Sequence, residues 1–180
     1  LADRLQKNFP AAFWHEAEGC LYDCITPEGA PDAAIRPNQV FALSLPHPLL
    51  ENERGKSVLA AVEKDLLTPR GLRTLSPRDS RYRGRYEGDV WSRDSAYHQG
   101  TVWPWLLGPF VEAYLRVYGV TPEIKAKARG FLTPLLEHLN EAGLGSISEV
   151  FDGDPPHRPG GCISQAWSVA EFLRIWALTE

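Results

Sequence analysis

The stretch that decides the fold is Trp103-Pro-Trp-Leu-Leu-Gly-Pro-Phe-Val-Glu-Ala-Tyr-Leu-Arg-Val-Tyr118. Its apolar residues recur every three or four positions, which is the spacing of one helix face, and they predict an amphipathic helix. Residues 122–142 and 165–178 carry apolar stripes of the same kind. The second half of the chain is therefore predicted to contain three helices.

Three more helices are predicted on the N-terminal side of this stretch. Residues 2–16 carry an apolar face, in which Pro10 predicts a kink or a break. Residues 37–45 begin with a proline suited to a first helical turn and continue into the apolar run Val40 to Leu45, which predicts a short helix. Residues 52–67 repeat apolar residues at helical intervals. With residues 20–35 as a turn-rich loop, the prediction is six helices and no convincing strand.

A long polar connection, residues 71–100, separates the two sets of helices. Connections of this length inside a compact domain are usually functional or disordered. This one carries too much aromatic mass to leave in water, so we expect an ordered active-site loop. Its aromatic residues are Tyr82, Tyr86, Trp91 and Tyr97. Paired helices joined alternately by short turns and long polar loops predict an all-α, layered α/α toroid with its long loops gathered at one rim.

The composition is that of an ordinary soluble domain. The chain has 180 residues, of which 43% are hydrophobic, and a formal net charge of −4. This balance gives no general attraction for nucleic acid or anionic lipid, so we expect neither nucleic acid nor a membrane as partner, and a neutral substrate fits better. The arginines between Arg70 and Arg93 are interleaved with acidic residues, which favours a salt-bridged loop over a phosphate-binding track.

The sequence also bears on location and completeness. No apolar run approaches the roughly 20 residues that cross a bilayer, and no secretory segment follows the charged N-terminus. Three cysteines without a zinc-ligand spacing fit reduced thiols in the cytoplasm. The chain has no methionine and starts at Leu1 inside a predicted helix. We therefore expect residues 1–180 to be a single partial domain, a fragment of a longer protein.

Two carboxylates lie in a short glycine-bounded turn, Gly145-Ser-Ile-Ser-Glu-Val-Phe-Asp-Gly153. The turn sets Glu149 before Asp152 and leads towards the last predicted helix. Acids delivered to one place by a constrained loop favour acid–base chemistry. The alternative is that Glu149 caps a helix, makes a turn or faces water, which isolated loop glutamates do more often.

A second stretch, Tyr97-His-Gln-Gly-Thr-Val-Trp-Pro-Trp105, brings a His-Gln pair and two tryptophans to a loop-to-helix transition. Aromatic faces pack on the C–H faces of a sugar ring while amide and imidazole groups bond its hydroxyls, so this mixture predicts a sugar site. The alternative is a core-packed helix start. Trp103 fits either role, and we expect Trp105 in the core.

Other chemistries find less support. His98 lacks the second histidine or the clustered carboxylates of a metal site, so we expect no metal and no cofactor. No Gly-x-Ser-x-Gly turn is present in the sequence, and Cys162 lacks a local signature of a catalytic cysteine. Hydrolysis through carboxylates is the remaining prediction.

Four stretches, in the same order, carry a resemblance that covers nearly the whole chain. They are Arg36-Pro-Asn-Gln39, Tyr97-His-Gln-Gly-Thr-Val-Trp-Pro-Trp105, Ser148-Glu-Val-Phe-Asp-Gly153 and Cys162-Ile-Ser-Gln-Ala-Trp-Ser-Val169. The sequence resembles the glucosidase domain of glycogen debranching enzymes. The resemblance implies an (α/α)6 barrel of twelve helices, of which the six predicted here are the C-terminal half, with the missing N-terminal half of the same protein as a partner.

The same resemblance implies an activity and the residues that perform it. The activity is amylo-α-1,6-glucosidase, which removes the single glucose left at a branch of glycogen or limit dextrin, with inversion, through one carboxylic acid and one carboxylate. Glu149 matches the general base. The acid is implied to be an aspartate upstream of Leu1, so the fragment alone would be inactive, and the local contenders Asp94 and Asp152 are interpreted as binding or orienting groups. Motif position implies a substrate-binding set made up of Arg36, Asn38, Gln39, Tyr97, His98, Gln99, Trp103, Asp152 and Gln165.

Two other functions stay open. One is a non-catalytic helical domain that binds α-glucans and would bind maltooligosaccharides without an upstream half. The other is an (α/α)6 glycosidase that acts on another sugar, which would keep the carboxylate chemistry and change the substrate.

Overall fold

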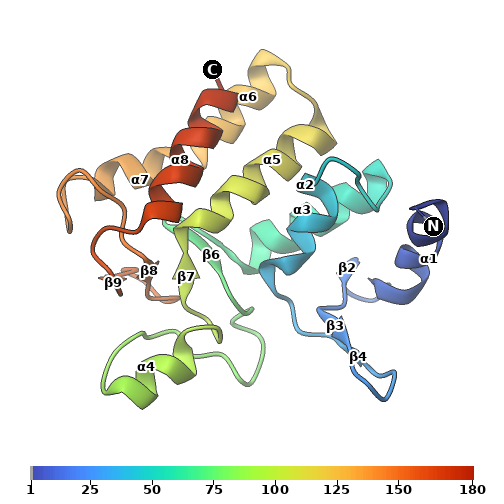
Figure 1. Ribbon diagram of the computed structural model, residues 1–180, viewed down its shortest axis with the longest axis horizontal. Helices are drawn as coiled ribbons and strands as arrows, with labels where there is room; N and C mark the ends of the chain where they lie inside the picture. Colours follow the sequence, from blue (N-terminus) through green and yellow to red (C-terminus); the bar gives the residue numbers. More distant parts are fainter. Residues whose placement is uncertain (1) are drawn as a thin grey trace.

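The structure, a computed structural model, describes residues 2–180 and is built mainly from helices (Figure 1). The α-helices are α1 (Ala2–Phe13), α2 (Phe41–Ser44), α3 (Asn52–Asp65), α4 (Val90–Ala96), α5 (Leu107–Tyr118), α6 (Pro122–Gly130), α7 (Thr133–His138) and α8 (Ala166–Leu178). Two 3-10 helices, η1 (Pro37–Val40) and η2 (Pro104–Leu106), lead into α2 and α5. In Figure 1 the larger helices form one layer, with α4 and the long loops below it.

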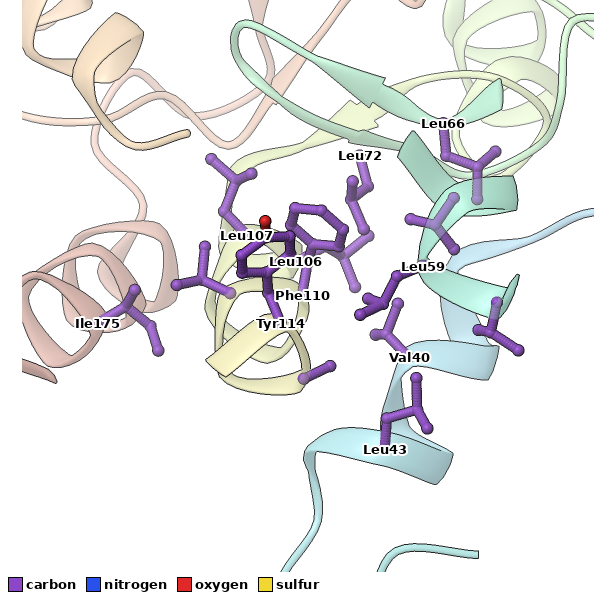
Figure 2. Close-up of a cluster of buried hydrophobic side chains, with 14 of the residues drawn as sticks. Val40, Leu43, Leu59, Leu66, Leu72, Leu106, Leu107, Phe110, Tyr114 and Ile175 are labelled. Atoms are coloured by element: carbon purple, nitrogen blue, oxygen red, sulfur yellow. The ribbon is translucent and has the colours of Figure 1, made fainter. Parts of the chain in front are cut away.

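Helix α5 is the centre of this layer. It packs against α2, α3, α6 and α8. Phe110 and Tyr114 of α5 are buried and lie between Leu59 of α3 and Ile175 of α8 (Figure 2). Fully burying a side chain of this kind contributes about 1.5–3 kcal/mol, so these interhelical contacts are a main source of stability. The stretch from which the fold was predicted is thus the helix on which the others pack.

Local signals explain where the helices around α5 begin and end. Helix α5 ends at Gly119, whose φ of 94° lies in the left-handed region that favours glycine. The Thr121 hydroxyl then accepts a hydrogen bond from the backbone N–H of Ile124 and caps α6. The chain therefore turns back within a few residues, which places α6 beside α5.

Short strands cover one end of the helical layer. Two antiparallel pairs are formed by β1 (Trp14–His15) with β2 (Cys20–Leu21) and by β3 (Cys24–Ile25) with β4 (Pro31–Asp32). A five-stranded antiparallel sheet has the order β5 (Leu67–Thr68), β6 (Gly71–Arg73), β7 (Val102–Trp103), β8 (Val150–Phe151) and β9 (Pro159–Gly160). The prediction that the chain has no convincing strand is wrong. Strands of two or three residues are too short to produce the alternating pattern by which strands are found in a sequence.

The five-stranded sheet brings the long loops together. Val102 of β7 pairs with Phe151 of β8. The segment that ends at Trp103 therefore lies beside the segment that carries Glu149, although the two are far apart in sequence. The long loops are gathered at one end of the helices, as predicted (Figure 1).

Several helix boundaries differ from the predictions. The helices predicted over 52–67 and 165–178 are confirmed by α3 and α8. The helix predicted over 2–16 ends at Phe13, because the next two residues pair with β2, and its Pro10 lies inside α1. The predicted helix 37–45 is confirmed as the continuous run of η1 and α2.

Two of the predicted long elements are divided. The helix predicted over 103–118 starts as a strand and a 3-10 turn, and becomes α-helical at Leu107. The prediction of a single helix over 122–142 is wrong, because α6 ends at Gly130 and α7 starts at Thr133. Pro134 explains this break: its ring has no N–H to donate and would clash with the carbonyl of Gly130 in a continuous helix.

The connection 71–100 is ordered and contains α4, which the sequence did not predict. Asp89 caps this helix by accepting a hydrogen bond from the N–H of Ser92 at 2.8 Å. Three arginines of the connection form ion pairs, as predicted: Arg78 lies 2.6 Å from Asp65, Arg81 lies 2.8 Å from Asp79, and Arg85 lies 3.1 Å from Asp152. The other three, Arg73, Arg83 and Arg93, donate to backbone carbonyls or to a serine hydroxyl instead.

Candidate active site

Glu149 directly precedes β8 and is partly buried. Two anchors fix the backbone around it. The buried His138 of α7 lies 3.1 Å from the hydroxyl of Ser148, and the N–H of Glu149 donates to the carbonyl of Cys162 at 2.9 Å. The backbone that carries the carboxylate is thus tied to the helical layer and to the loop that leads into α8.

Both oxygens of the Glu149 carboxylate receive hydrogen bonds. The hydroxyl of Tyr97 donates to Oε1, and the backbone N–H of Cys162 donates to Oε2 at 2.8 Å. Gly161 passes against the carboxylate, and a Cβ at this position would collide with Oε2. Its φ of 68° lies in the left-handed region, so glycine is favoured here for both backbone conformation and space.

These contacts determine the charge of Glu149. Burial raises the pKa of its carboxyl, but the hydrogen bonds from Tyr97 and from the Cys162 amide lower the pKa by more, so the net shift is downward. The side chain of Gln165 contributes in the same direction. Glu149 is therefore ionised at neutral pH, which suits a base and not an acid.

An aromatic cluster adjoins this carboxylate. The ring of Tyr97 lies edge-on to Trp103, with ring centroids 4.7 Å apart, and the Trp103 indole N–H donates to the Tyr97 carbonyl at 3.1 Å. His98 stacks on Trp103 with an interplanar angle of 5°. Burial, and then the nearby Arg36 guanidinium, lower the pKa of His98, so its imidazole is neutral at pH 7.

Two residues of this cluster, His98 and Trp103, line an open pocket of about 190 Å³. Its aromatic lining includes Trp167, which is 45% exposed and stacks on Trp105 at 5.1 Å between centroids. The lining residues are Pro37, Asn38, Thr74, His98, Trp103, Trp105, Leu106 and Trp167. A more polar pocket of about 390 Å³ shares four of these residues and adds Asp23, Asp32, Arg36 and Gln99. Aromatic faces beside placed polar groups are the surface that a sugar ring needs.

Arg36 holds three loops together beside the pockets. Its guanidinium donates to the carbonyl of Thr74 at 2.9 Å, to the carbonyl of His98 at 2.6 Å, and to Oε1 of Gln99 at 2.8 Å. The sequence prediction placed Arg36, His98 and Gln99 in one site, and the structure brings them together. Their contact with a substrate stays a prediction.

Asn38 and Gln39, which also belong to the predicted substrate-binding set, differ in exposure. Asn38 is exposed at both pockets and donates to Oδ1 of Asp23 at 2.8 Å. Gln39 is buried, and its amide bonds the backbone of Arg36 and of Leu21 at 3.0 and 3.3 Å. The side chain of Gln39 therefore connects η1 to β2, and a role in substrate binding stays a prediction.

The predicted acids other than Glu149 lie in different surroundings. Asp152 is 2% exposed and accepts hydrogen bonds from Arg85, from Arg158 and from the N–H of Tyr86, at 3.1, 2.7 and 2.8 Å. Burial raises the pKa of Asp152, but these donors lower it by more. Asp94 is exposed on α4.

Among residues 2–180, no group of three or more His, Cys, Asp or Glu side chains is arranged to hold a metal ion. No helix in the described part of the chain is long and apolar enough to cross a membrane.

Comparison with known proteins identifies the family. The sequence model described as amylo-alpha-1,6-glucosidase matches residues 1–174. The chain belongs to this family. It is 33% identical over 177 residues to the glycogen debranching enzyme of Saccharomyces cerevisiae, in an alignment that covers 87% of this chain. That alignment covers 12% of the yeast enzyme, so the chain spans a small part of this relative.

Solved structures confirm the fold class of this amylo-alpha-1,6-glucosidase family member. Neutral trehalase from Saccharomyces cerevisiae matches with a TM-score of 0.61 and 18% identity, over 96% of this chain and 28% of the trehalase. A GH63 mannosylglycerate hydrolase from Thermus thermophilus matches with a TM-score of 0.63 and 19% identity, over 91% of this chain and 36% of the hydrolase. The predicted (α/α)6 glycosidase fold is confirmed.

Sequence reasoning missed two features of the site in this family member. Trp167 was not included in the predicted substrate-binding set. Its position at the start of a predicted helix, two residues after Gln165 in the last of the four stretches, was the available signal. The backbone N–H of Cys162 was missed because a main-chain donor leaves no trace in the residue type. Trp105, expected in the core, packs against the core and also lines the pocket.

Proposed function

We propose that this chain is part of an enzyme that hydrolyses α-1,6-glucosidic branch linkages of glycogen or limit dextrin with inversion, and that Glu149 is its general base. The observation that carries the proposal is a partly exposed carboxylate held by two neutral donors beside an aromatic pocket. The family and its glycogen debranching relative support the substrate class.

The surroundings of Glu149 suit an inverting reaction. The base must be ionised in order to take a proton from the attacking water, and the lowered pKa of Glu149 keeps it so at neutral pH. A carboxylate offers about four lone-pair positions, and Tyr97 and Cys162 occupy two of them. We propose that one of the remaining positions accepts a hydrogen bond from the water that attacks the anomeric carbon.

Inversion also needs a carboxylic acid about 6.5–9.5 Å from the base, which leaves room for the water. Asp152 is a poor candidate for it, because two arginines keep its carboxylate ionised and buried. We propose that the acid lies upstream of Leu1, and that the chain described here supplies the base and part of the glucose subsite.

The test uses the full-length protein and an α-1,6-glucosyl limit dextrin. Proton NMR during the first minutes should detect β-glucose released before mutarotation, because inversion at an α-linkage gives the β-anomer. Glu149→Gln should reduce the rate of release by about 10²–10⁴-fold. Undiminished release by the variant would refute the assignment of the base, and α-glucose as the first product would refute inversion.

A different sugar is the second candidate, because two solved structures that share the fold are a trehalase and a mannosylglycerate hydrolase. Their low identity supports the fold alone, so the sugar has to be measured. A panel of limit dextrin, trehalose and mannosylglycerate, assayed with the full-length protein and its Glu149→Gln variant, separates the possibilities.

The exposed face of Trp167 supports a third candidate, a glucan-binding domain without chemistry of its own. Titration of maltooligosaccharides against residues 1–180, followed by tryptophan fluorescence, distinguishes a binding domain from a part of a catalytic domain. A dedicated binding domain should saturate without any upstream segment, and its Glu149→Gln variant should bind equally well.

A further inference from the structure

We propose that Tyr97 is a positioning residue, whose hydroxyl fixes the Glu149 carboxylate and whose ring joins that carboxylate to the aromatic wall of the pocket. This inference rests on the proposed function of Glu149. It assigns to Tyr97 a role other than the substrate contact implied by its motif.

The position of the Tyr97 hydroxyl is determined by the packing of its ring. The ring centroid lies 4.7 Å from that of Trp103, 4.9 Å from that of His98, and 5.6 Å from that of Tyr86. The carbonyl of Tyr97 accepts the indole N–H of Trp103, which fixes the backbone as well. Contacts on several sides leave the tyrosine little freedom to swing away from Glu149.

The hydroxyl and the ring of Tyr97 have different partners. The ring contacts His98 and Trp103, which line the 190 Å³ pocket, while the hydroxyl donates to Glu149 Oε1. The hydrogen of the Tyr97 hydroxyl is therefore committed to the carboxylate. This geometry favours action on the substrate through Glu149.

The chemistry of the pair is consistent with this role. Burial and the Glu149 carboxylate both raise the pKa of the Tyr97 hydroxyl, so it remains a donor at every pH where an enzyme works. A donor to the ionised form of a carboxyl lowers the pKa of that carboxyl. With the Cys162 N–H on the other oxygen, the two donors define the plane of the carboxylate and leave its remaining lone pairs in fixed directions.

The decisive experiment is the pH dependence of kcat for the full-length protein and for Tyr97→Phe, with limit dextrin as substrate. Removing the hydroxyl should lower kcat by about ten- to hundredfold, the kinetic equivalent of one hydrogen bond to a charged group, with KM changed by less than about twofold. The acidic limb of the profile should move to higher pH, because the base loses a donor that favours its ionised form. A purely structural role would not move this limb.

Tyr82→Phe is the matched control. The Tyr82 hydroxyl donates to Oδ1 of Asp154 at 2.9 Å, so this variant also removes one tyrosine–carboxylate hydrogen bond from the same connection. It leaves the contacts of Glu149 intact. The acidic limb should stay at its wild-type position.

The outcomes separate this inference from the proposed function. If Glu149→Gln keeps full activity, the proposed function fails. If Glu149→Gln is inactive while Tyr97→Phe raises KM and leaves the acidic limb unmoved, only the positioning role fails. Should Tyr97→Phe not fold, the substitution Tyr97→3-fluorotyrosine keeps the hydroxyl and makes it a stronger donor. The limb should then move to lower pH, and an unmoved limb would overturn the proposal.

Discussion

Glu149 and Asp152 stand three residues apart, on either side of the two-residue strand β8, and their surroundings differ. Asp152 is almost fully buried and meets two arginines and a backbone N–H. Glu149 is partly exposed and meets a tyrosine hydroxyl and a backbone N–H. Among the described residues, no lysine or arginine forms an ion pair with Glu149.

The difference shows how one short segment can carry a carboxylate that stabilises the fold and another that is available for catalysis. Arginine partners neutralise the charge of Asp152 and connect the residue after β8 to the connection before α4. The charge of Asp152 therefore serves the fold and is not available for chemistry. Neutral donors orient Glu149 and lower its pKa without cancelling its charge. A carboxylate held in this way keeps both its negative charge and acceptor positions for water.

The largest difference between the two acids is expected when each is replaced by its amide. Glu149→Gln should lower kcat by about 10²–10⁴-fold and reduce the free energy of unfolding by less than Asp152→Asn does, since no ion pair is lost. Glucose-release kinetics and urea unfolding of the full-length protein measure the two effects. A loss of stability as large as that of Asp152→Asn would contradict the division of roles.

Gly161→Ala tests whether the position of the Glu149 carboxylate matters. The new Cβ would press against Oε2, and we expect kcat to fall about ten- to hundredfold because a small displacement of a catalytic group is costly. Gly145→Ala is the matched control, since Gly145 has a φ of 88° and nothing within 4 Å of the added Cβ. Both variants should lose stability in thermal unfolding because both strain a positive φ, Gly161→Ala more because of the added collision, and only Gly161→Ala should lose activity. Equal kcat values would argue against a tightly held carboxylate.

Asp152→Asn is expected to act on stability. The arginines that it leaves are half-exposed and regain water, so the loss should be about 1–3 kcal/mol, below that for breaking a fully buried pair. Asp154→Asn removes a charge but keeps an amide oxygen that accepts the hydrogen bond from Tyr82, so it should cost less. Urea denaturation midpoints compare the two variants, and equal losses would mean that the arginines around Asp152 add nothing.

The smallest effect concerns pH. Because the folded-state pKa of Asp152 is lowered, its contribution to stability is present above the ordinary aspartate value of 3.8 and is lost as the pH falls through the lowered folded-state value. The difference in unfolding free energy between wild type and Asp152→Asn should therefore shrink on acidification below that value. A difference that is constant from neutral to acid pH would contradict the assignment.

Much of the helical architecture was predictable from the sequence, because long amphipathic elements carry their own periodicity. Helices α3 and α8 were found in this way. Helix α4 was missed because it is only seven residues long and buries a single side chain, Ala96, so it has no apolar stripe. The two-residue strands were missed for the same reason of length.

The candidate site was predictable as a set of residues and not as a geometry. The stretches around Tyr97 and Glu149 were both selected, but nothing in the sequence indicates that the hydroxyl of one meets the carboxylate of the other across 52 residues. That contact depends on the pairing of β7 with β8. Strands of two residues are too short for the sequence to indicate that they form or which strand they pair with. The separate role of Asp152 likewise depends on arginines distant in sequence.

The pairing of β7 with β8 also sets an order in time. A ribosome makes Tyr97 first, Glu149 52 residues later, and the Cys162 amide a further 13 residues after that. The carboxylate gains its tyrosine donor only when the nascent chain closes the long loop back to Tyr97, and its amide donor only when the residues just before α8 have been made. The site around Glu149 therefore cannot be completed until three separate segments of the chain have been synthesised.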